Sequence, residues 1–428
     1  MRTAASILTA AIVVFGTRGP DAYAQSDPGA RYVRLALALD AATDGGYVFA
    51  YLGPAAVREE AAKAGLSVAQ IADETHDLIA DIDRTEASGV ETNRLAALRL
   101  QLSAMLARID VLRGERMSFD EEALRIFGVR PPRYSVAEAD SALDAVEKLL
   151  PGEGSLAARA AAFQSRLRIP VERQEAVFRA AIAACRVRTA EHIDLPPAEE
   201  LELVFVDELP ASGRYDYLGD YRGRVTVNRS SANMNNAIYL GCHEAYPGHH
   251  LQAILIEGQH GGREWPELKL AALFGPASVV SEGLGQFAVD LAMTDAEKVR
   301  LYRDELFPLA GLDPDDAERL VAFSRAMQAL VPYGTIEISR AYLDGDIGLD
   351  EAIDVLSKYA LQQREQMAPM FKFVDAFRTY VVTYSLGHDL VRDRINAAGE
   401  QPRARWAAFR HLSTALVTPE LLMLEAAR

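Results

Sequence analysis

One short segment of the chain gathers several side chains that bind metals. It reads HEAYPGHHLQ from His243 to Gln252 and holds three of the eight histidines. A His-Glu pair followed by another histidine about one helical turn later is typical of zinc hydrolases, in which neutral imidazoles bind the metal. The glutamate beside the first ligand faces the water that attacks the substrate. The residue types therefore indicate a zinc-dependent hydrolase, with His243 as a ligand and Glu244 as the base.

The spacing of the second histidine departs from the usual pattern. In that pattern it follows the first by four residues, and Pro247 occupies this position here. In an unbroken helix His249 would lie on the wrong face, and His250 about 10 Å along the axis from His243. Proline and the following Gly248 interrupt helices, so we expect a bulge of two residues that brings His249 to the ordinary ligand position. The alternative is a helix that ends at Pro247, with two surface histidines.

A third ligand is expected downstream, at Glu282. Zinc hydrolases commonly add a carboxylate to two histidines and leave one position open for water. Glu282 lies in an apolar run beside Gly283 and Gly285, which permit close approach of another backbone. An acid in such surroundings is costly unless it is paired or bound to a metal. The residues alone equally allow an acid in the first turn of a helix, where the helix dipole stabilises it.

The segment from His243 to Gln252 resembles the signature of the bacterial domain of unknown function family 885, which is similar to zinc metallopeptidases of the His-His-Glu type. That signature reads His-Glu, two variable residues and Pro-Gly-His, usually with Leu-Gln two places on. The resemblance implies Zn²⁺ ligands at His243 and His249 and a general base at Glu244. It ranks His250 second as a ligand.

The resemblance extends to two later segments. The sequence around Glu282 resembles the family's Glu-Gly-Trp-Ala segment, with Leu284 and Gly285 in place of Trp and Ala, and implies that Glu282 is the third ligand. A further acid of the family falls next to Asp290. Residues 378–387, which read RTYVVTYSLG, resemble a late segment that ends in Tyr-Lys-Ile-Gly, and this match places Tyr384 at the position of the tyrosine.

These assignments define a hypothetical mechanism. A zinc ion activates a water molecule, and Glu244 accepts its proton and passes it to the leaving amine. Tyr384 stabilises the tetrahedral oxyanion, and His388, one turn further on, is the reserve for this role. From the residues alone, Tyr384 is more simply a core tyrosine with a satisfied hydroxyl. The run Arg224–Asn228 offers either a sheet edge for an extended peptide or an ordinary surface strand.

The elements that must position these residues are mostly helices. Apolar residues recur at helical spacing over 68–82 and 95–112. Two β-type runs, Leu201–Val206 and Arg224–Asn228, flank a Gly- and Tyr-rich loop over Gly213–Tyr221. We predict a mainly α fold with a small β-sheet, which the resemblance refines to a gluzincin-type architecture around an active-site cleft.

The domain organisation follows from the same elements. We expect an N-terminal helical region over 25–195 and a metallopeptidase-like catalytic region with the sheet over 196–428, joined in one continuous fold. The composition is that of a globular protein, with half of the residues apolar and a quarter charged. The formal charge of −16 argues against nucleic acid and anionic membranes as partners.

The N-terminus carries an export signal. Residues 1–24 combine Arg2, an apolar run too short to span a bilayer and the site Ala22-Tyr23-Ala24, which predicts a cleaved signal peptide. The mature product is expected in the periplasm or outside the cell, with no stable membrane insertion. Cys185 and Cys242 are expected there either as a disulfide or as free buried thiols.

Three classes of function remain open from the sequence. The first is an exported zinc peptidase that acts on a peptide or small amide substrate. The second is a zinc hydrolase of a non-peptide amide or ester. The third is a binding protein that kept the fold and lost turnover. Measured zinc content and peptide cleavage distinguish these classes.

Overall fold

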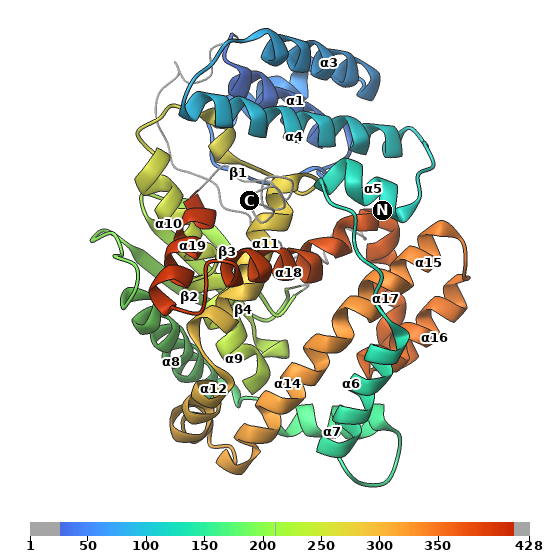
Figure 1. Cartoon of the computed structure of the whole chain (residues 1–428), viewed down its shortest axis with the longest axis vertical. Helices are drawn as coiled ribbons and strands as arrows, with labels where there is room; N and C mark the ends of the chain where they lie inside the picture. The colour runs from blue at the N-terminus through green and yellow to red at the C-terminus, as the bar shows by residue number, and fades with distance from the viewer. Residues whose placement is uncertain (1–25, 210, 415–428) are drawn as a thin grey trace.

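The computed structural model describes residues 26–209 and 211–414, so the signal peptide predicted over 1–24 lies outside the described residues. Within these ranges the chain is mainly helical with small sheets, which confirms the fold class predicted from the sequence (Figure 1). In the same part of the chain, every helix is too short or too polar to cross a membrane.

The first half of the chain is a series of helices that the sequence begins and ends locally. These are α1 (Pro28–Ala42), α2 (Ala55–Ala64), α3 (Val68–Arg84), α4 (Val90–Leu112), α5 (Phe119–Phe127), α6 (Val136–Leu149), α7 (Leu156–Arg166) and α8 (Val171–Ala190). The two predicted apolar stripes lie on α3 and α4. Ser67 and Gln70 form a capping box at the start of α3, which satisfies backbone N–H groups that the helix leaves unpaired.

The second half contains the helices α9 (Met234–Leu240), α10 (His249–His260), α11 (Pro276–Ala292), α12 (Asp295–Leu301), α13 (Phe307–Ala310), α14 (Ala317–Pro332), α15 (Ile338–Asp344), α16 (Leu349–Ala360), α17 (Arg364–Phe377), α18 (Val382–Asn396) and α19 (Pro402–Thr414). Helices α11 and α18 cross with their backbones in contact. A Cβ atom on Gly283 would lie 2.3 Å from the carbonyl oxygen of Gly387. Only glycines permit this approach, which brings Tyr384 of α18 to the helix that carries Glu282.

A three-stranded sheet follows α8 and precedes α9 in the chain. Its strands are β2 (Glu200–Val206), β3 (Gly213–Gly219) and β4 (Arg222–Asn228), in the order β2-β4-β3. Strand β4 pairs with β2 in parallel and with β3 in antiparallel orientation. The predicted exposed edge at Arg224–Asn228 is therefore wrong, because β4 is the central strand.

The predicted loop over Gly213–Tyr221 is also wrong, since most of it forms β3. Tyr215 and Tyr217 alternate with more exposed residues and point into the core. Their bulky rings suit a half-buried strand, and the glycines that suggested a loop lie at the two ends of β3.

A second, two-stranded sheet connects the regions before and after residue 195. Strand β1 (Val48–Tyr51) pairs in antiparallel orientation with β5 (Leu270–Ala272). Two hydrophobic cores are present, and each takes residues from both sides of residue 195. Helices of the first half thus cover the elements that carry the candidate site (Figure 1).

Candidate metal centre

The segment that carries the three histidines is an interrupted helix. Helix α9 continues into a π-helical turn, η3 (Gly241–Ala245), and a new helix, α10, begins at His249. Between them the Tyr246–Pro247 peptide bond is cis. Gly248 fits only without a side chain, because a Cβ atom there would lie 1.8 Å from the carbonyl oxygen of His243. The interruption expected at Pro247 and Gly248 is therefore present, and the widened turn precedes it.

This interruption brings two imidazoles together. The Nε2 atoms of His243 and His249 lie 3.1 Å apart, and both side chains are buried. Burial lowers the pKa of His243 to about 3, and burial together with His243 lowers the pKa of His249 well below its usual value. Both rings are therefore neutral at ordinary pH, which is the form that binds metals.

Glu282 approaches the same point from α11. Its Oε2 atom lies 3.8 Å from Nε2 of His243, and the residue is completely buried. Among the described residues, neither of its carboxylate oxygens has a hydrogen-bond partner. Burial, with the nearby charge of Glu244, raises the pKa of Glu282 well above its usual value. A buried carboxylate without a partner is costly, and a bound cation would remove that cost.

The space between these side chains is kept open by Gly285. A Cβ atom at this position would lie 2.9 Å from Cε1 of His243 and 3.0 Å from Nε2 of His249. Glu282 and Gly285 are one helical turn apart on α11, so they face the imidazoles together. Two neutral imidazoles, an unpaired carboxylate and a cradle that a methyl group would fill fit a divalent cation such as zinc.

Glu244 adjoins this group. His243, Glu244 and His249 each offer a ligating atom within 4.8 Å of the others, so these three residues could hold a metal ion. Burial, with Asp216 nearby, raises the pKa of Glu244 to about 8, although the backbone N–H of Tyr215 donates to its carboxylate. This hydrogen bond sets Glu244 apart from Glu282, whose carboxylate oxygens have no such partner.

His250 faces away from the candidate ligands. Its Nδ1 atom lies 3.0 Å from the hydroxyl of Tyr215, and its Nε2 atom lies 3.1 Å from Oε1 of Glu199. Arg186 holds the other oxygen of Glu199 at 3.0 Å. Since both ring nitrogens are engaged, His250 ties β3 to the turn before β2, and His249 is the histidine placed beside His243.

Two further contacts hold the segment around His243 in place, one that the sequence analysis left open and one that it missed. Cys185 of α8 and Cys242 of η3 form a disulfide next to His243. The ring of Tyr239 stacks on the ring of His243, with 4.9 Å between centroids. Tyr239 precedes His243 by four residues, and this one-turn spacing is the signal that could have identified it.

The two candidates on α18 have different surroundings. Burial, together with Tyr380 and Glu282, raises the pKa of Tyr384 well above its usual value, so the phenol stays protonated beside the candidate centre. His388 lies further along α18, with Nδ1 3.2 Å from Asp389 and Nε2 3.6 Å from Asp290. Nδ1 is thus within hydrogen-bond distance of Asp389, whereas Nε2 faces Asp290 without a hydrogen bond among the described residues.

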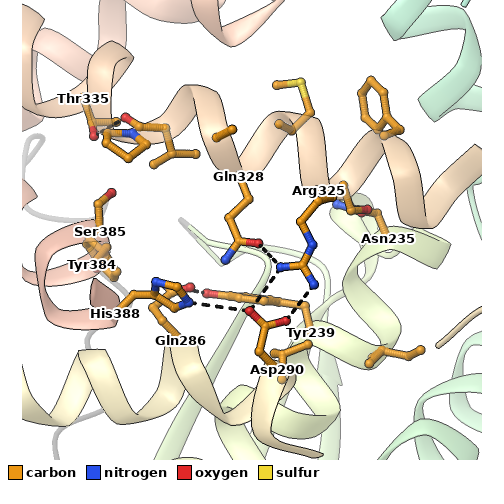
Figure 2. A pocket seen from close by; sticks show the side chains of 18 of the residues that line it. Asn235, Tyr239, Gln286, Asp290, Arg325, Gln328, Thr335, Tyr384, Ser385 and His388 are labelled. Carbon is orange, nitrogen blue, oxygen red and sulfur yellow. Dashed lines mark hydrogen bonds and ion pairs between the residues drawn. The ribbon is translucent and has the colours of Figure 1, made fainter. Parts of the chain in front are cut away.

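A pocket of about 780 Å³ begins at this point, and Tyr239, Gln286, Tyr384 and His388 are among its lining residues. Figure 2 shows Tyr239 and Tyr384 on its wall together with Asp290. Nε2 of Gln286 donates a hydrogen bond of 3.0 Å to the hydroxyl of Tyr239. Because Tyr239 also stacks on His243, its side chain lies between the pocket and the candidate metal centre.

The fold and this site define a mainly helical protein with a candidate metal centre beside a pocket. The chain matches no family model and no curated protein. Its fold is similar to that of a candidate lipoprotein from Colwellia psychrerythraea, with a TM-score of 0.50 and 16% identity over 92% of this chain and 74% of that one. A candidate lipoprotein of unknown function from Shewanella oneidensis gives a TM-score of 0.51 and 14% identity over 87% and 76% of the two chains.

A third solved structure is the M32 carboxypeptidase from Deinococcus radiodurans R1, with a TM-score of 0.48 and 13% identity over 95% of each chain. At these identities the likenesses concern the fold alone.

Proposed function

We propose that this protein is an exported, zinc-dependent, metallopeptidase-like hydrolase that cleaves peptide bonds. The observation that carries this proposal is the convergence of His243, His249 and the unpaired carboxylate of Glu282 around the space beside Gly285. The resemblance to family 885 names the same three ligands. The disulfide between Cys185 and Cys242 supports an oxidising compartment.

Glu244 is the proton carrier in this proposal. A zinc ion held by the three ligands supplies Lewis-acid chemistry, polarising the substrate carbonyl and acidifying a water molecule. The Oε2 atom of Glu244 has no hydrogen-bond partner among the described residues, so in the ionised form, which dominates above its pKa of about 8, it is available to accept the proton of the attacking water. The same atom then delivers the proton to the leaving nitrogen. The N–H of Tyr215 keeps the carboxylate in place during both steps.

Two phenols supply hydrogen bonds to the carbonyl oxygen as negative charge develops on it. Tyr384 is the first, and Tyr239 is a second that the structure adds. Because Gln286 donates to the oxygen of Tyr239, the proton of this hydroxyl is left for the substrate. Burial raises the pKa of Tyr239 above its usual value, so it remains a donor.

Strand β3 is an edge strand of the three-stranded sheet, and one of its main-chain groups contacts the candidate centre. The N–H of Asn228 in β4 donates to the carbonyl of Ser212. In an antiparallel pair, alternate residues face the partner strand, so the main-chain groups of Gly213, Tyr215 and Tyr217 face away from β4. Tyr215 N–H reaches Glu244, which directs this edge towards the candidate centre.

The test combines metal analysis with a peptide library. The mature chain is purified and reconstituted with zinc, and its metal content and peptide cleavage are compared with those of Glu244→Gln. We expect one bound zinc in both proteins and cleavage only in the parent. Zinc without cleavage favours a hydrolase of a non-peptide amide or ester, or an inactive binding protein. Failure to bind zinc contradicts the metal centre, and cleavage by Glu244→Gln contradicts the proposed base.

A further inference from the structure

The pocket beside the candidate centre has a charged wall. Its cationic side chains are Lys298, Arg325, His388 and Arg392. They come from α12, α14 and α18. Figure 2 shows Arg325 and His388 directed towards Asp290 of α11. Cationic side chains in a pocket can bind a negatively charged end of a substrate. They can do so only if other carboxylates do not already occupy their hydrogen-bond donors.

Each of the two cations nearest Asp290 lies between two carboxylates. Nζ of Lys298 is 2.7 Å from Asp290 and 3.4 Å from Asp295. Nη2 of Arg325 is 3.1 Å from Asp290 and 2.6 Å from Asp295. Two cations and two carboxylates thus neutralise one another on this side of the pocket.

The same arrangement recurs on α18. His388 lies between Asp290 and Asp389. Arg392 contacts Asp389 at 2.6 Å and Asp393 at 2.9 Å. Three of these carboxylates, Asp290, Asp295 and Asp389, line the pocket together with the four cationic groups, whereas Asp393 is not a lining residue. Each cationic group of the wall is therefore already in an ion pair with a carboxylate.

Arg325 is the side chain best suited to bind a carboxylate, and it has no donor left. Its Nε donates to Asp295, its Nη1 donates to Asp290 and Gln328, and its Nη2 donates to Asp290 and Asp295. These bonds use all five N–H groups of a guanidinium. A substrate carboxylate would have to displace Asp290 or Asp295, whose oxygens lie 2.6–3.3 Å from the donors of Arg325.

The rest of the pocket offers apolar surface. Side chains of α14 and α17 face the charged wall, and they include Val321, Phe323, Met327, Val331, Met370 and Phe373. Val331 is 40% exposed, so part of this surface is open to a ligand. The volume of about 780 Å³ lies in the range of pockets that enclose small ligands.

We propose that this pocket binds an uncharged, apolar segment of a peptide on one side of the cleaved bond, and that it discriminates against a free terminal carboxylate. The inference rests on the proposed function, because the pocket ends at Tyr239 and Tyr384. A free carboxylate entering the pocket loses its hydration and finds no unpaired cation. An uncharged acyl or amide end contacts the apolar side chains of the pocket, and the hydration it loses is weaker than that of a carboxylate.

The experiment uses the full mature chain with Glu244→Gln, so that no probe is cleaved. The probes are N-acetyl-Leu-Leu-amide and N-acetyl-Leu-Leu with a free carboxylate, titrated by calorimetry in EDTA and again with zinc. The titration in EDTA is decisive, because a carboxylate can bind zinc directly. We expect the amide to bind about tenfold more tightly than the acid, a difference of about 1.4 kcal/mol.

Two substitutions locate the binding. Val331→Lys should weaken amide binding about tenfold, whereas Val187→Lys, at a 57% exposed valine of α8 outside the pocket, should leave it unchanged. Asp295→Asn, which releases N–H groups of Arg325, should narrow or reverse the preference for the amide.

Three results overturn the proposal: equal or tighter binding of the acid in EDTA, no binding of either probe, or no effect of Val331→Lys. None of these results depends on bound zinc. Failure of the metal centre would instead appear as an absence of bound zinc, with probe binding retained.

Discussion

His243 and His249 are six positions apart in the chain, and their Nε2 atoms lie 3.1 Å from each other. A continuous helix would place these rings on different faces. The π-helical turn at Gly241–Ala245 and the break before His249 remove that obstacle. The two neutral rings then lie together, and Glu282 approaches His243 to 3.8 Å.

Glu282→Gln should have opposite effects with and without metal. In EDTA the variant should melt at a higher temperature than the parent, because a buried, unpaired carboxylate is replaced by a neutral amide. With zinc at about 1,000 times the dissociation constant, the parent should gain about 4 kcal/mol of unfolding free energy, and the variant should gain little. Thermal melts with and without zinc measure both effects. An equal response of the two proteins to zinc would exclude Glu282 as a ligand.

Gly285→Ala should weaken zinc binding because its methyl group would occupy the space between the two imidazoles. We expect a loss of at least about tenfold in zinc affinity, by analogy with the loss of a group that supports a ligand. Gly262→Ala is the matched control, since a Cβ atom there meets nothing within 4 Å. Competition with a fluorescent chelator gives both affinities. Equal zinc affinities of the two variants would show that the space beside Gly285 is not needed for zinc binding.

Tyr239→Phe and Tyr384→Phe should each lower kcat by about 100- to 1,000-fold, which is the usual cost of losing one donor to an oxyanion. KM and zinc content should change little, because the rings and the ligands remain. Gln286→Leu should have a smaller effect on kcat, since Gln286 orients Tyr239 by donating a hydrogen bond to its hydroxyl. Steady-state kinetics on a cleaved library peptide provide the measurement. A rise in KM alone would assign the tyrosines to substrate binding.

His388→Gln should destabilise the protein more in mild acid than in alkali. Burial lowers the pKa of His388, but Asp290 and Asp389 outweigh it and raise the pKa above the usual value. A raised pKa in the folded state contributes stability that is fully present below the unfolded pKa of about 6.5 and is lost as the pH rises through the folded value. Urea unfolding at pH 5.5 and pH 8.5 measures the difference. A larger loss at pH 8.5 would contradict the charged form of His388.

Much of the candidate site could be predicted because it lies in two short segments of sequence. The types and order of His243, Glu244 and His249, with Pro247 between them, indicate the candidate ligands and the need for a break in the helix. Helix α9 and the π-helical turn, by contrast, have no clear pattern of their own. Their geometry depends on contacts such as the disulfide from Cys242 to α8.

The parts that the sequence did not predict arise from long-range packing. The sequence predicts a loop in place of strand β3 because glycines lie at its ends, and the two tyrosines of β3 form a buried face only when the strand pairs with β4. The pocket combines α11, α14 and α18, and its ion pairs join Asp290 to Arg325, 35 positions further on. No local pattern specifies such pairs.

We propose above all that His243, His249 and Glu282 bind one divalent cation. Crystals of the mature chain grown with zinc, measured on both sides of the zinc absorption edge, test it most directly. We predict a single anomalous peak between these three side chains, at about 2.0–2.3 Å from each ligating atom. A peak at another site would contradict the proposed metal centre. So would the absence of an anomalous peak beside Gly285 at saturating zinc.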